Sequence, residues 1–166
     1  MAATAGIVVP TGAIRYGNQH IALKRVAEGA ITPGNLVKKG TADYLVVVNT
    51  AGAYPSGVAD LNYKAREDNN DPLTHAFAAG EECMVIIHGM VRVVADTSAF
   101  TAGDRVMAGD TDGAEVEDQD ATAPSAADTY ATADFTAIIG GLRTSIGFGL
   151  TSAATTVAGV IMLTLC

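Results

Sequence analysis

Apolar and polar residues alternate along most of this chain in short runs separated by turn residues, as all-β domains do. Strand-length runs recur at residues 20–26, 43–49, 57–63, 82–88, 90–95, 135–139, 144–150 and 156–165. Gly89 divides the two central runs and indicates a bend or bulge. Asp71 and Pro72 suit the N-cap and first position of a helix ending before Gly80, so one short helix is expected at residues 72–79. The pattern predicts a small all-β barrel or sandwich of short strands with Gly-rich turns and at most one short helix.

One turn-and-strand pattern occurs twice, 69 residues apart: ITPGNLVKKG from Ile31 and FTAGDRVMAG from Phe100. In both copies a glycine can supply the positive φ of a type II turn. The Asn or Asp that follows can bond its side chain back to the turn backbone. Two interpretations stay open, a repeated hairpin unit within a β-barrel or a chance similarity between two turns of a Gly- and Thr-rich chain.

Composition supports strands and a single domain. Of the 166 residues 49% are hydrophobic but only 5% aromatic, with 18 Gly and no Trp. Small and β-branched side chains favour closely packed strands. We expect one β-rich domain over residues 1–166. Residues 1–19 are either an N-terminal arm or the first strand of the barrel, and residues 110–134 read as an acidic loop insertion.

Charge limits the classes of partner. The net charge is −8, which disfavours nucleic-acid binding because that binding depends on Lys and Arg neutralising phosphates. Residues 144–166 are uncharged, but Ser, Thr and Gly dilute their apolar character below that of a membrane span. The N-terminus has no basic segment followed by a long apolar run, so no secretory signal is expected. The sequence therefore predicts neither a nucleic-acid partner nor a membrane.

The sequence contains no recognisable catalytic or metal-binding motif. The histidines His20, His75 and His88 lie outside every zinc-binding spacing, and no nucleophile elbow or phosphate-binding loop occurs. Cys83 alternates with Val85 and Ile87 on one strand face, where a buried core thiol is expected. It and Cys166 lack metal-ligand spacing, and nothing implies an oxidising compartment, so we expect free thiols. The sequence predicts no catalytic residue, no cofactor site and no metal site.

The acidic stretch from Asp110 superficially has the alternate carboxylates of a calcium loop, with Asp112, Glu115 and Glu117. An EF-hand loop needs a bidentate Glu at its twelfth position, where this chain has Ala121. The alternatives are an irregular divalent-ion site and a solvated loop that keeps particles soluble. We expect the solvated loop.

Three segments carry a resemblance to a known family: GAITPGNLV at residues 29–37, AAGEECMVIIHGMVRVV at residues 78–94, and FTAGDRVMAG at residues 100–109. They resemble the head-decoration, or capsid cement, proteins of tailed bacterial and archaeal viruses. The resemblance covers residues 20–110 well and the closing strands loosely. The insertion at residues 110–134 is longer than the loop that the family leads one to expect.

The resemblance implies a non-enzymatic structural protein on the exterior of the virion head. It further implies a homotrimer that binds the major capsid protein and stabilises contacts between neighbouring capsid subunits. Two other classes stay open: a small ligand- or carbohydrate-binding module for surface attachment, with Tyr44, Tyr54 and Tyr63 as the candidate platform, and an enzyme that uses Cys83.

Overall fold

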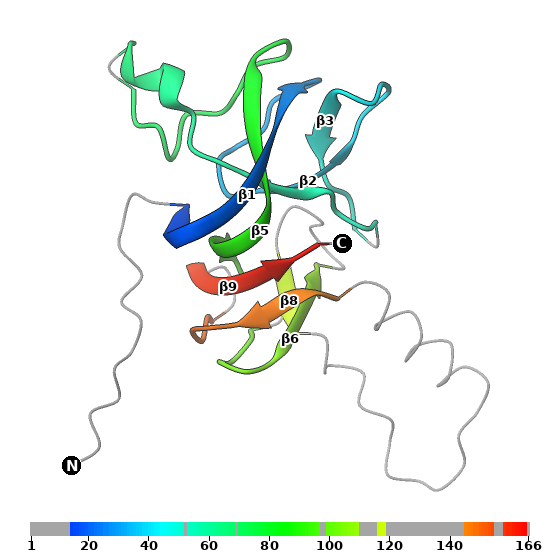
Figure 1. Ribbon diagram of the computed structural model, residues 1–166, viewed down its shortest axis with the longest axis vertical. Helices are drawn as coiled ribbons and strands as arrows, with labels where there is room; N and C mark the ends of the chain where they lie inside the picture. Colours follow the sequence, from blue (N-terminus) through cyan, green and yellow to red (C-terminus); the bar gives the residue numbers. More distant parts are fainter. Residues whose placement is uncertain are drawn as a thin grey trace, which may run out of the picture.

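The computed structural model describes residues 14–51, 53–68, 70–96, 99–109, 116–118, 145–154 and 158–165. Nine strands and one short 3-10 helix account for the regular structure of these residues (Figure 1). They are β1 (Arg15–Ala27), β2 (Leu36–Lys39), β3 (Leu45–Val48), β4 (Gly57–Ala59), η1 (Tyr63–Arg66), β5 (Glu82–Val94), β6 (Arg105–Ala108), β7 (Val116–Asp118), β8 (Ser145–Gly149) and β9 (Ala158–Thr164). The all-β prediction is confirmed.

The strands form one continuous sheet, in the order β1-β3-β2-β4-β5-β9-β8-β6-β7, that closes on itself twice. In the first closure, β1 pairs with β3 on one side and with β5 on the other, so that β1, β3, β2, β4 and β5 form a ring. We call this ring the first barrel. It occupies the upper part of Figure 1.

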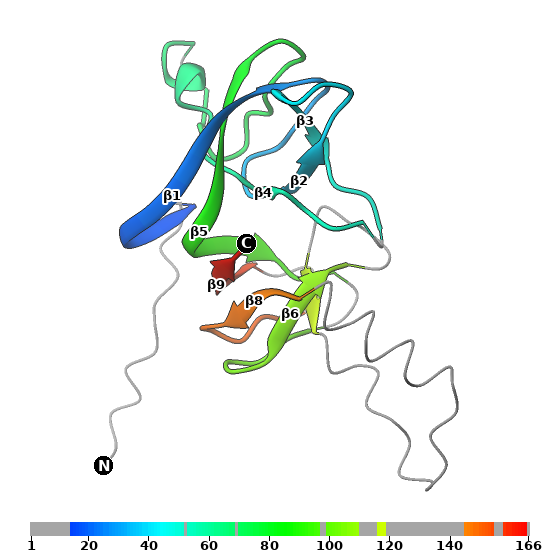
Figure 2. The same ribbon diagram turned by 45° about the vertical axis from the view of Figure 1, so that its right-hand side comes forward.

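The second closure uses the other half of β5. Here β5 pairs with β9, and the ring continues through β8, β6 and β7. A parallel bridge between Ala95, just after β5, and Val116 of β7 closes it. This second barrel lies below the first, and β5 runs through both of them (Figure 2).

The two barrels repeat the same strand connections, so the repeated pattern at Ile31 and Phe100 reflects a structural duplication. The N–H of Gly34 donates to the carbonyl of Ala59 at 2.8 Å, and the N–H of Gly103 donates to the carbonyl of Gly149 at 2.9 Å. Both turn glycines have positive φ, 90° and 101°. The parallel pairing of Ala27 with Val46 recurs as the bridge between Ala95 and Val116. The alternative of a chance similarity is therefore wrong.

Two apolar clusters correspond to this arrangement. The smaller cluster fills the first barrel and contains Ile31, Val37, Ala59, Phe77 and Cys83 among others. The larger cluster combines the interior of the second barrel with side chains of the first barrel that alternate with the interior ones. Its buried members are Ile14, Leu36, Val58, Ile86, Val91, Val93, Ala95, Phe100, Val106, Ala108, Val116, Ile146, Ala153, Ile161 and Leu163.

Some local predictions were wrong. Residues 72–79 form no helix. The Asp71 carboxylate does accept a 2.9 Å hydrogen bond from the N–H of Leu73, as an N-cap would, but the turn ends because Phe77 pairs with Ile31 in a β-bridge. Gly89 does not divide two strands. It lies within one continuous strand of 13 residues, so not all strands are short. The expected bend or bulge is nevertheless confirmed there, because Gly89 has a φ of 125° and the pairing of β5 with β1 shifts register between His88 and Met90.

Three further segments differ from expectation or lie outside the description. Residues 15–19, assigned to an arm or a first strand, belong to β1. The expected strand at residues 57–63 stops at Ala59, and the expected loop at residues 110–134 contains β7. The strand expected at residues 135–139 lies outside the described residues. Within the described part of the chain, no helix has the length and apolarity needed to cross a membrane.

Candidate functional site

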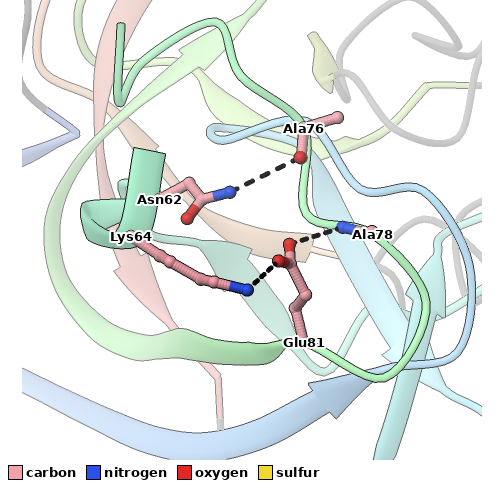
Figure 3. Close-up of polar contacts among 5 residues, drawn as sticks. All are labelled: Asn62, Lys64, Ala76, Ala78 and Glu81. Atoms are coloured by element: carbon pink, nitrogen blue, oxygen red, sulfur yellow. Dashed lines mark hydrogen bonds and ion pairs between the residues drawn. The ribbon is translucent and has the colours of Figure 1, made fainter. Parts of the chain in front are cut away.

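The connection between β4 and β5 carries a group of polar contacts on the first barrel. The buried amide of Asn62 donates a 3.4 Å hydrogen bond from Nδ2 to the carbonyl of Ala76 (Figure 3). Lys64 of η1 donates from Nζ to Glu81 Oε1 at 2.7 Å, and the N–H of Ala78 donates to Glu81 Oε2 at 2.7 Å. Both oxygens of one carboxylate thus hold the loop against the start of β5.

This arrangement shifts the protonation of both partners. The hydrogen bond from Lys64, followed by the one from the Ala78 N–H, lowers the pKa of the Glu81 carboxyl. The same contact raises the pKa of Lys64. A hollow of about 520 Å³ lies beside the pair, with Leu61, Tyr63 and Phe77 in its lining. The charged groups in its lining are paired, Lys64 with Glu81 and Lys24 with Glu82.

A buried charge lies on the first barrel, directly after β4. Asp60 is fully buried and forms an ion pair with Arg15 of β1, whose side chain is 35% exposed. Burial, together with the negative charge of Asp60, raises the pKa of the Cys83 thiol to about 12. A nucleophilic cysteine needs the opposite shift, because the thiolate is the reactive form. Cys83 is a free core thiol, as its strand position predicted.

The histidines do not come together as a metal site. His20 Nε2 lies 3.1 Å from the carbonyl of Met90, while the side chains of His75 and His88 are exposed. Among the residues that the structure describes, no group of three His, Cys, Asp or Glu side chains is placed to hold a metal ion. Cys166 and the acidic positions Asp110, Asp112 and Glu115 lie outside the described residues, and Glu117 falls in β7.

The three candidate tyrosines are exposed but lie on different connections. Tyr44, 62% exposed, precedes β3; Tyr54, 47% exposed, precedes β4; Tyr63, 50% exposed, begins η1. Of the three, Tyr63 lines the hollow beside Lys64, whereas Tyr44 and Tyr54 are not in its lining. The tyrosines therefore give no sign of a shared platform for a sugar ring.

The fold defines a class: an all-β protein built of two closed rings of strands that share β5. The chain belongs to the family described as structural cement protein (E217 gp24/Pam3 gp6), which matches residues 4–164. A comparison with solved structures found the N base of head fiber gp8.5 of bacteriophage phi29, with a TM-score of 0.51 and 11% identity over 87% of this chain and 94% of that chain. At this identity the likeness supports the fold alone. No curated protein matches the chain.

Family membership confirms the resemblance seen in the sequence and makes the chain a structural component of a phage virion. Sequence reasoning missed the buried pair of Arg15 and Asp60 and the clamp on Glu81. The signal for the clamp was present, because Glu81 follows Gly80 directly after the loop. No sequence signal linked Arg15 with Asp60, which are 45 residues apart and meet only because β1 and β4 both flank β5.

Proposed function

We propose that this protein binds the outer surface of the phage capsid as a homotrimer and holds neighbouring major capsid subunits together. The observation that carries the proposal is the family match over residues 4–164, nearly the whole chain. The protein contributes binding energy and rigidity, and the role needs no catalysis, cofactor, nucleic acid or membrane.

The physical basis of the proposed role is multivalency. Three copies of a modest contact joined in one trimer bind far more tightly than one contact, because the second and third contacts form intramolecularly. A body of two barrels sharing β5 suits this role, since closed rings of strands leave few free edges and deform little. Capsid subunits bridged by such a body would resist the outward pressure of a packed genome.

The experiment is co-sedimentation of the purified protein with empty, expanded shells of its virus. Saturable binding at a fixed ratio of protein to capsid subunit is expected. A matched control replaces Tyr44 and Tyr54 by Ser. This variant should bind shells as the parent does, since the proposed contact does not involve a sugar platform. Absence of saturable binding to shells would overturn the proposal. Retention of the parent protein on immobilised glycans, lost in the Tyr44 and Tyr54 variant, would favour the carbohydrate-binding alternative instead.

A further inference from the structure

The second barrel carries an exposed row of side chains across its outer face, which we call the outer row. It consists of Arg105 on β6, Phe148 on β8, Met162 on β9 and Met90 on β5, each directly paired with the next across neighbouring strands. Phe148 is 45% exposed, Arg105 is exposed, and the two methionines are partly buried. Four neighbouring strands thus present a continuous apolar strip to solvent with a cation at one end.

The first barrel has the same row at the equivalent positions. Leu36 on β2 pairs with Val58 on β4, Val58 with Ile86 on β5, and Ile86 with Ala22 on β1. Leu36, Val58 and Ile86 are fully buried and belong to the cluster shared with the second barrel. The row of the first barrel is therefore covered by the second barrel, whereas the equivalent outer row of the second barrel is uncovered.

The chemistry of the outer row is that of an interface. Aromatic residues, methionine and arginine are enriched in the contact surfaces of proteins. The guanidinium of Arg105 lies 6.0 Å from the centroid of the Phe148 ring, which places a cation at the edge of the apolar strip. Arg105 forms no ion pair within the part of the chain that the structure describes.

Complementary charge lies at the far end of the same molecule. Glu67, Asp68 and Asp71 are exposed directly after η1, and none of them forms an ion pair with another described residue. In Figure 1, η1 lies at the top of the first barrel, whereas β6 and β8 lie at the bottom of the second. The acidic turn and the strand that carries Arg105 thus lie at opposite ends of the molecule.

We propose that the outer row of one copy packs against η1 and the acidic turn that follows it (Glu67, Asp68 and Asp71) on the next copy. Such a head-to-tail contact is heterologous, and it yields a ring if its rotation closes. This inference rests on the homotrimer of the proposed function and identifies the surface that builds it. It does not depend on shell binding, so the two proposals can fail separately.

The first test measures the mass of the protein in solution by light scattering. The Phe148→Asp variant places a charge in the middle of the strip and should convert the oligomer into monomers. Since Phe148 is half-exposed, the melting curve of the variant should stay close to that of the parent. The matched control is Tyr44→Asp, a charge on an exposed aromatic residue of the first barrel, which should leave the mass unchanged.

The second test is charge reversal. Arg105→Glu alone and Asp68→Lys alone should each weaken the oligomer at least tenfold in dissociation constant. The double variant carries both changes on every copy, so each contact regains opposite charges and association should recover most of the loss.

The outcomes separate the two proposals. A monomeric parent protein, an oligomeric Phe148→Asp variant, or a double variant no better than its parents would overturn the head-to-tail contact. If Phe148→Asp stays oligomeric but loses binding to shells, the outer row contacts the capsid instead of a second copy, which also overturns it. If the parent forms the oligomer and ignores shells, the contact stands and the proposed capsid role falls.

Discussion

The two barrels have the same backbone hydrogen bonds, but the large aromatic side chain in each interior comes from a different partner of the equivalent β-bridge. In the first barrel Ile31 bridges Phe77, so the phenylalanine comes from the second partner. In the second barrel Phe100 bridges Ala153, and the phenylalanine comes from the first partner. The backbone hydrogen bonds of the duplicated unit are thus the same in both barrels, while the large side chain can come from either partner of the bridge.

The glycines of the second barrel follow from this exchange. A Cβ on Gly159 would lie 2.6 Å from Phe100 Cζ, and one on Gly149 would lie 3.0 Å from Phe100 Cδ2. The equivalent positions in the first barrel hold Cys83 and Ala59, which the smaller Ile31 leaves room for. The phenylalanine ring thus occupies space that two side chains occupy in the other barrel.

The largest effect is expected from Phe100→Ala, which empties the centre of the second barrel. The free energy of unfolding should fall by about 3–5 kcal/mol, because Gly149 and Gly159 have no side chains that could fill the cavity. Chemical denaturation followed by circular dichroism measures it, with Phe77→Ala as the matched change in the first barrel. A loss below about 1 kcal/mol at Phe100 would contradict the packing described.

The next effect concerns a polar feature that the second barrel lacks, since Leu150 occupies the position of Asp60. Arg15→Ala would leave the buried Asp60 carboxylate without its ion-pair partner and should cost about 3 kcal/mol. The double variant Arg15→Met and Asp60→Leu replaces the pair with apolar side chains, with Leu as at position 150, and should regain most of that loss. Urea denaturation of the three proteins checks this, and an Arg15→Ala variant as stable as the parent would be the contrary result.

A smaller effect is expected from Gly159→Ala, which crowds the Phe100 ring and the Ala153 Cβ, 2.6 and 2.9 Å away. The expected loss is about 1–3 kcal/mol. Combining it with Phe100→Ile, which gives the second barrel the side chain of the first, should remove most of the crowding. A double-mutant cycle on thermal unfolding measures the coupling, and strict additivity of the two changes would show that the ring and Gly159 do not compete for space.

The smallest effect is pH-dependent and belongs to the loop that distinguishes the first barrel. The contacts of Glu81 lower its pKa below the ordinary value of 4.5, so their stabilisation is present above that pH and is lost as the pH falls through the lowered value. Glu81→Gln should therefore make the acid-side decline of stability shallower. Lys64→Met should act in the same direction, since it removes the main cause of the shift. Unfolding curves between pH 6 and 3 test both, and an unchanged slope would argue against the clamp.

The sequence predicted the parts of the fold that depend on local chemistry. The Gly34 and Gly103 turns and their Asn or Asp partners were readable because positive φ restricts the residue type, and the Asp104 carboxylate indeed accepts from the N–H of Thr101 at 2.7 Å. The helix was wrong because Asp71 and Pro72 specify how a turn starts but not whether it continues. Gly89 was read as a divider because its partners on β1 and β9 are far away in the sequence.

Two features could not be predicted from the sequence: the extent of the duplication beyond the two turns, and the outer row. Alternation along a strand assigns residues to two faces but does not tell which face another barrel covers. Leu36 and Arg105 occupy equivalent positions, but Leu36 is buried and Arg105 is exposed. Phe77 and Ala153 are also equivalent, although one side chain is large and the other small. The residue types at these positions therefore differ between the barrels, while the backbone hydrogen bonds are the same.

The central claim, that the protein stabilises a capsid, is tested most directly by the thermal rupture of shells. Empty expanded shells are heated with and without saturating protein, and the release of free capsid subunits is followed by light scattering. The rupture temperature should rise with the parent protein, and it should rise less with the Phe148→Asp variant, which binds without the multivalency of the oligomer. Shells that bind the protein at saturation and still rupture at the same temperature would contradict it.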